Sequence, residues 1–169
     1  MESLYLFQDQ LIRATDFLFR RNMLDQIEWN ERLIGLIGAK GVGKTTMMLQ
    51  HLRENTDKHD EMLYVTMDNV FMKLDSLFAL AQRFYASGGK RLYIDEIHKY
   101  PGWAQELKNI YDLLPQLKVV FSGSSLVKIL SEKADLSRRA VMYHVPGLSY
   151  REFLQIVLGE EFPLFPLSA

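Results

Sequence analysis

The most informative part of the chain is the stretch Leu33-Ile34-Gly35-Leu36-Ile37-Gly38-Ala39-Lys40-Gly41-Val42-Gly43-Lys44-Thr45. It opens with an apolar run that ends in glycine, which is typical of a buried strand that leads into a loop. From Gly38 to Thr45 it fits the pattern G-x-x-x-x-G-K-[ST], which binds phosphate when it lies between a strand and a helix. Helix-like residues from Thr45 to about Asn55 follow. The stretch therefore predicts a phosphate-binding loop.

The residue types in this segment suit the binding of a nucleotide's phosphates. Glycines let the backbone curl so that successive N–H groups point at phosphate oxygens, and the following helix adds the positive end of its dipole. We expect Lys44 to reach the β- and γ-phosphates of ATP and the Thr45 hydroxyl to ligate Mg²⁺. The predicted nucleotide-binding residues are Gly38, Ala39, Lys40, Gly41, Val42, Gly43, Lys44, Thr45 and Thr46.

A pair of acidic residues, Asp95-Glu96, follows the apolar run Leu92-Tyr93-Ile94. In a phosphate-loop site an acidic residue on a neighbouring strand holds Mg²⁺, commonly through water, and Asp95 takes this role. Glu96 is placed to accept a proton from the water that attacks the γ-phosphate. The alternative for Glu96 is a solvated carboxylate at a strand end.

Apolar runs alternate with helical patterns along the whole chain. This alternation predicts crossover connections and a parallel sheet between helices, with the ligand at the carboxyl ends of the strands. Besides the first strand, we expect strands at 62–67, 92–94, 118–121 and 140–145. We expect one or two helices within 3–28, and further helices at 45–55, 70–86, 103–114 and, after a Ser149–Glu152 capping box, 150–158.

Composition narrows the class of protein. A length of 169 residues fits one domain, and 48% hydrophobic residues permit an ordinary core. The net charge of −1 gives no overall attraction to nucleic acid or an anionic membrane. The chain has no cysteine, which excludes disulfides and thiolate metal sites, and its four histidines lack metal-ligand spacing. No signal peptide or membrane span is visible, so we expect a cytoplasmic protein.

Four further stretches add a resemblance to a known family. Together with the loop, they resemble the AAA-type P-loop ATPases, in which an additional strand carries the catalytic glutamate. Within that superfamily they are similar to a prokaryotic branch that is usually followed by a C-terminal domain of uncharacterised function. The similarity covers about residues 20–158 and rests on Asp95-Glu96-Ile97-His98-Lys99-Tyr100-Pro101-Gly102-Trp103, Phe121-Ser122-Gly123-Ser124-Ser125, Leu136-Ser137-Arg138-Arg139 and Pro146-Gly147-Leu148-Ser149.

The resemblance implies a three-layer α/β sandwich whose parallel five-stranded sheet has the order 5-1-4-3-2. It also implies a polar sensor between Glu96 and the γ-phosphate, for which Ser122 is preferred over Ser124. Arg139, which is preferred over Arg138, matches an arginine that stabilises charge on the transferring phosphoryl group. The expected catalytic residues are Glu96, Lys44, Ser122 and Arg139, and the expected metal ligands are Thr45 and Asp95.

The predicted organisation has three parts. Residues 1–30 form an N-terminal helical segment packed on the core, with Arg20 to Gln26 as the expected region for adenine contacts. Residues 31–158 form the ATPase core. Residues 159–169 form a linker or the start of a missing C-terminal domain, and we expect no helical lid.

These observations support two functions of different classes. The first is an ATPase that binds Mg-ATP, hydrolyses the β–γ bond and couples this to a conformational change, but is slow in isolation. The second is a nucleotide-gated module that recruits a partner with little turnover. The expected ligands are ATP and ADP with Mg²⁺, and the expected partners are another protein or a second copy of the chain. A role on DNA is a weaker hypothesis, resting on the basic bias between Lys118 and Arg151.

Overall fold

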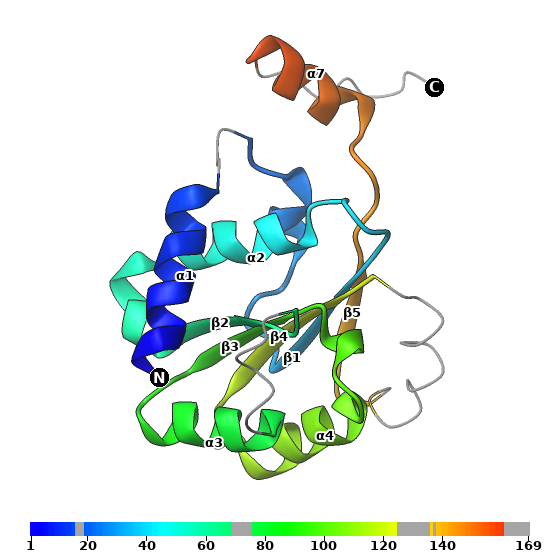
Figure 1. Cartoon of the computed structure of the whole chain (residues 1–169). Coiled ribbons are helices and arrows are strands. Elements are labelled where there is room, and N and C mark those ends of the chain that lie inside the picture. Colours follow the sequence, from blue (N-terminus) through cyan, green and yellow to red (C-terminus); the bar gives the residue numbers. More distant parts are fainter. Residues whose placement is uncertain (16–18, 69–75, 125–135, 137, 161–169) are drawn as a thin grey trace.

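The computed structural model describes residues 1–15, 19–68, 76–124, 136 and 138–160. Its five strands pair in parallel in the order β2-β3-β4-β1-β5 (Figure 1). Read from the other edge, this is the predicted order 5-1-4-3-2, so the predicted sheet is confirmed. The strands are β1 (Leu33–Ile37), β2 (Met62–Thr66), β3 (Arg91–Asp95), β4 (Lys118–Gly123) and β5 (Val141–His144).

Helices cover both faces of the sheet and make three layers. The helices α1 (Glu2–Ala14) and α2 (Lys44–Arg53) lie on one side, and α3 (Leu77–Ala86) and α4 (Trp103–Leu113) lie on the other (Figure 1). Two hydrophobic clusters result, one on each face. Every residue of β1 and β3 is buried, which is the physical reason that β1 and the central residues 92–94 of β3 are apolar.

The last helix stands apart from these layers. α7 (Tyr150–Leu158) lies beyond the end of β5 (Figure 1) and begins with the predicted capping box between Ser149 and Glu152. It ends at Gly159, whose φ of +69° is the left-handed conformation that glycine adopts without strain. Much of its apolar surface is exposed, at Tyr150, Phe153, Ile156, Val157 and Leu158.

Two predicted helical regions can be compared in detail with the structure. The region 3–28, predicted as one or two helices, contains α1 and, after residues 19–21, a short 3-10 helix η1 (Asn22–Gln26). The predicted helix 70–86 begins at Leu77 among the described residues, with the Ser76 hydroxyl capping the N–H of Ala79 at 3.0 Å. Two more 3-10 helices, η2 (Thr56–Glu61) and η4 (Ile97–Lys99), have no counterpart in the sequence prediction. In the described parts of the chain, no helix is long and apolar enough to cross a membrane.

One buried side chain of α1 closes the exposed edge of the sheet. Gln8 has no exposed surface, and its Oε1 accepts the backbone N–H of Tyr64 on edge strand β2 at 2.7 Å. Its Nε2 donates to the Met62 carbonyl at 3.5 Å. An edge strand leaves backbone groups without a neighbouring strand, and here a glutamine amide stands in for one. The α1 helix is therefore attached to the sheet by polar as well as apolar contacts.

Replacing Gln8 with alanine should therefore destabilise the fold. The substitution leaves the buried N–H of Tyr64 without an acceptor, and an unsatisfied buried group costs about 1–3 kcal/mol. Urea unfolding of Gln8→Ala should show a correspondingly lower free energy of unfolding. Gln10→Ala, an exposed position on the same helix, is the matched control and should unfold like the wild type. Equal stability of the two variants would contradict the edge-capping role.

Candidate functional site

The loop from Gly38 to Gly43 connects β1 to α2, as the sequence predicts. Gly41 and Gly43 have φ of +85° and +94°, a backbone conformation that residues other than glycine rarely adopt. Gly38 is required for space, because a Cβ there would lie 2.4 Å from the carbonyl oxygen of Val145 at the end of β5. The curled loop leads directly into the N-terminus of α2, an arrangement that points backbone N–H groups at a bound anion.

Lys44 is folded back into this loop. Its side chain is buried, and its Nζ donates to the carbonyl oxygens of Gly38 at 2.9 Å and Ala39 at 2.8 Å. Burial lowers the pKa of Lys44, while the charges of Glu96 and Asp95 act in the opposite direction. The ammonium group is thus held by the loop at the place where the sequence puts the phosphates.

Asp95 is the centre of the polar network. It is buried at the end of β3, and its Oδ2 accepts hydrogen bonds from Thr45 Oγ1 at 2.6 Å and from the Tyr64 hydroxyl at 2.7 Å. Its Oδ1 accepts from the Ser122 hydroxyl and from the backbone N–H of Glu96 at 3.1 Å. Burial and the Asp95 charge raise the pKa of Tyr64, which therefore stays protonated and donates. The structure thus brings together the two predicted metal ligands, Thr45 and Asp95.

Glu96 lies beside this network in an unusual backbone conformation. With φ of +53° it is, among the described residues, the one non-glycine residue with positive φ. Its Oε2 accepts a hydrogen bond from Ser124 Oγ at 3.3 Å and lies 3.4 Å from His98 Nε2. The His98 side chain is 13% exposed, so it is not a surface histidine. The carboxylate is thus held by two polar groups at the carboxyl edge of the sheet.

The two candidate sensor hydroxyls occupy different places. Ser122 is fully buried; its hydroxyl donates its hydrogen to Asp95 and its oxygen accepts the Glu96 N–H at 3.0 Å. Because that hydrogen is used by Asp95, Ser122 in this arrangement cannot also donate to a phosphate. Ser124 is the hydroxyl on the Glu96 carboxylate. Ser122 therefore contacts Asp95, whereas Ser124 contacts the Glu96 carboxylate.

Arg139 lies away from the loop of its own chain. It lies two residues before β5, whose first residue, Val141, pairs with Ile34 near the start of β1, whereas the loop follows the end of β1. At about 3.3 Å per residue this places Arg139 roughly 15–20 Å from the loop along the strands. Its guanidinium donates to both carboxylate oxygens of Asp112, each at 3.0 Å. The structure therefore does not bring Arg139 together with the other predicted site residues.

A buried ion pair that the sequence did not indicate lies against the loop. Arg21 Nε donates to Glu152 Oε1 at 3.0 Å, and both side chains are at least nine-tenths buried. The same guanidinium donates to the Val42 carbonyl in the loop and, at 3.1 Å, to that of Pro146 before α7. One cation thus ties together the N-terminal segment, the phosphate loop and the start of α7.

The sequence carried only weak signals for these supporting residues. Arg21 falls inside the segment 20–26 that we expected near the adenine, and Glu152 was recognised only as part of a capping box. Tyr64 is one aromatic residue in an apolar strand, and nothing in its spacing marks it as a partner of Asp95. In the described ranges no group of three histidine or acidic residues could hold a metal, which is compatible with Mg²⁺ because that ion uses few protein ligands.

The fold and the loop together define the P-loop NTPase class of α/β proteins. The family model described as an AAA domain matches residues 30–154, and the chain therefore belongs to this AAA-domain family. No protein of curated function matches the chain.

Solved structures share the fold at low sequence identity. DnaA from Aquifex aeolicus bound to AMPPCP aligns with a TM-score of 0.57 and 13% identity, over 89% of this chain and 49% of that one. Hsp104 in a closed state with ATPγS and FITC casein aligns with a TM-score of 0.61 and 18% identity, over 90% and 32%. The S. cerevisiae Hsp104–ADP complex aligns with a TM-score of 0.52 and 20% identity, over 90% of this chain and 24% of that one. The chain spans half or less of these proteins' length, and the likeness concerns the fold alone.

The Arg21–Glu152 pair should make stability depend on pH in the acidic range. Burial raises the pKa of Glu152, but the Ser149 backbone N–H and the Arg21 charge outweigh it, so the pKa lies below its usual value. A lowered folded-state pKa gives stability that is present above the unfolded-state pKa and is lost as pH falls through the folded-state pKa. The free energy of unfolding of the wild type should fall accordingly between neutral and acidic pH.

Glu152→Gln should be destabilised at pH 7 by about 3 kcal/mol, because it leaves a buried arginine unpaired. It should also lose less stability than the wild type on acidification. Guanidinium unfolding at several pH values measures both effects. Glu160→Gln, at an exposed position just after α7, should follow the wild-type curve; if Glu152→Gln follows it as well, the pair does not stabilise the fold.

Proposed function

We propose that this domain binds ATP with Mg²⁺ and hydrolyses the β–γ bond, using the conversion to change its own conformation. The observation that carries the proposal is the contact of Thr45 with Asp95 at 2.6 Å, with Glu96 next in the chain and Lys44 in the loop. A hydroxyl and a carboxylate at this spacing are the oxygen donors that a Mg²⁺–nucleotide complex requires.

In the proposed binding mode the phosphates replace contacts that the loop now makes with itself. Lys44 leaves the Gly38 and Ala39 carbonyls and pairs with the β- and γ-phosphates, while the N–H groups of the loop and of α2 bind the remaining oxygens. Thr45 and Asp95 would hold Mg²⁺, which supplies neutralisation of phosphate charge. Tyr64 and Ser122 keep the Asp95 carboxylate fixed for this task.

In the proposed reaction Glu96 acts as the general base. A water oxygen forms a bond to the γ-phosphorus as the bond to the β,γ-bridging oxygen breaks, and the water proton passes to Glu96. The products are ADP and inorganic phosphate. Ser124 and His98 contact the Glu96 carboxylate, and in this proposal Ser124 transmits the state of the γ-phosphate to β4.

The position of Arg139 favours a second candidate function. Because this arginine lies at the amino-terminal end of the strands and the phosphate loop at the carboxyl end, it cannot stabilise the transition state in its own chain. A single chain would then bind ATP tightly yet turn over slowly, which is the behaviour of a nucleotide-gated recruitment module, since tight phosphate binding does not itself speed the chemistry. Self-association that brings Arg139 to a neighbouring site would restore turnover.

Two variants separate binding from chemistry. Lys44→Ala should abolish ATP binding measured by titration calorimetry, because the phosphates lose their main cation. Glu96→Gln should keep binding within a few-fold of the wild type and lower steady-state phosphate release by about 10²-fold or more, the usual effect of removing a general base. If Lys44→Ala still binds ATP, the loop assignment is wrong. Equal phosphate release by the wild type and Glu96→Gln would favour the recruitment module.

The role of Arg139 can be tested through protein concentration. If it completes a neighbour's site, phosphate release per chain should rise with protein concentration, and Arg139→Ala should abolish that rise while leaving ATP binding intact. Its exposed pair with Asp112 adds little stability, so the variant should fold. Arg138→Ala is the comparison at the adjacent exposed position. Loss of the rise in Arg138→Ala alone would transfer the role to that residue.

A further inference from the structure

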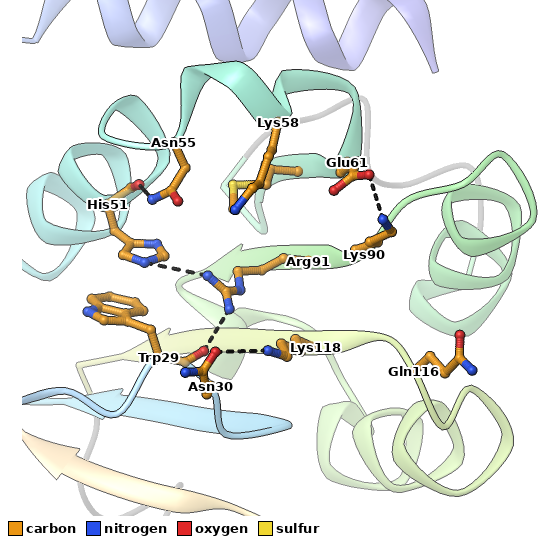
Figure 2. Close-up of a pocket in the computed structure, with 11 residues that line it drawn as sticks. Trp29, Asn30, His51, Asn55, Lys58, Glu61, Lys90, Arg91, Gln116 and Lys118 are labelled. Atoms are coloured by element: carbon orange, nitrogen blue, oxygen red, sulfur yellow. Dashed lines mark hydrogen bonds and ion pairs between the residues drawn. The ribbon is translucent and has the colours of Figure 1, made fainter.

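A pocket opens at the amino-terminal ends of the strands, whereas the phosphate loop lies at their carboxyl ends. It lies where β2, β3 and β4 begin and where α2 leads into η2 (Figure 2), and its volume is about 460 Å³. That volume lies within the range of small-molecule sites. Its lining residues are Trp29, Asn30, His51, Asn55, Lys58, Glu61, Met62, Lys90, Arg91, Gln116 and Lys118.

The charge of this pocket is strongly positive in a chain whose net charge is −1. Its lining has four cationic side chains and one carboxylate, Glu61, which is paired with Lys90 at 2.6 Å. Lys58, Arg91 and Lys118 therefore have no anionic partner among the lining residues. In Figure 2 the Lys58 side chain extends from η2 toward the Arg91 guanidinium. Three cations converge on one small space.

Arg91 forms the rigid floor of the pocket. Its side chain is fixed by a hydrogen bond to the Trp29 carbonyl at 2.7 Å and a contact with His51 Nε2 at 3.4 Å. The residue is only 8% exposed, and its Nε has no hydrogen-bond partner within the described ranges. A buried arginine without an anion is costly, which makes its position here informative.

The neighbouring groups do not compensate this charge. His51 stacks on Trp29 with ring centroids 3.7 Å apart, and burial together with Arg91, Arg20 and Lys58 lowers its pKa to about 3, so it is neutral. Burial and the charges of Arg91 and Lys58 also lower the pKa of Lys118. A bound anion would relieve this mutual repulsion.

We propose that this pocket binds a small, multiply charged phosphate compound. Phosphate oxygens match the donors of a fixed arginine and two lysines, and a ligand with about three negative charges would balance the three cations that lack an anion. Exposed carboxylates flank the lining residues along the chain: Glu28 and Glu31 lie beside Trp29 and Asn30, and Asp57 and Asp60 lie beside Lys58 and Glu61. These negative charges would repel an extended polyanion such as nucleic acid. The site is separate from the nucleotide loop and does not depend on the ATPase proposal.

The test uses inorganic pyrophosphate and the Lys44→Ala protein, in which the phosphate loop is disabled. Calorimetry should show one saturable site whose affinity falls with salt. Adding Lys58→Ala should weaken binding about tenfold, the effect of losing a charge-assisted contact of about 1.4 kcal/mol. Lys58 has no side-chain hydrogen bond or ion pair among the described residues, so this variant should fold normally. Lys108→Ala on α4 is the matched control and should bind like the parent.

Absence of saturable binding, or an unchanged affinity in Lys58→Ala, would overturn the proposal. Lys118→Gln provides a second variant, with a similar loss expected. A short single-stranded oligonucleotide is tested in parallel. If it binds more tightly than pyrophosphate and loses affinity in Lys58→Ala, the pocket binds a nucleic-acid backbone and the small-ligand proposal is wrong.

Discussion

The Asp95 carboxylate is the constraint on which the site's geometry depends. Four hydrogen bonds reach it, from a hydroxyl on α2, a phenol on β2, a hydroxyl on β4 and the next backbone N–H. A buried carboxylate is stable only when it is hydrogen-bonded, and satisfying this one fixes the relative positions of three strands and the helix after the loop. The network that stabilises the charge therefore also aligns the groups proposed to act on nucleotide.

The core of the site could be predicted because its signals are local. Gly38 to Thr45 form one continuous segment of loop and helix start, and Asp95 ends a largely apolar strand, so each can be recognised without knowing which residues lie across the sheet. The sheet order followed from the family resemblance. The contacts of Tyr64 and Ser122 with Asp95 depend on which strands become neighbours and how they are registered, and no spacing along the chain encodes that.

The same reasoning applies to other polar residues whose surroundings the sequence does not indicate. Gln8 and Arg21 are polar residues in segments that read as amphipathic or irregular, and only the fold shows that they are buried against backbone carbonyls and N–H groups. The motif that contains Arg139 does not indicate at which end of the strands this residue lies. Polar groups that act through distant backbone contacts are invisible to periodicity.

The left-handed backbone conformation of Glu96 lowers the stability of the fold at the residue that the proposed reaction needs as its base. A left-handed conformation is unfavourable for a glutamate by about 1 kcal/mol and costs glycine nothing, so the fold alone would prefer glycine here. Selection of this chain for heat resistance would favour replacing the residue that the proposed chemistry needs most. Retention of glutamate under such selection would mean that function, rather than folding, determines the residue at position 96.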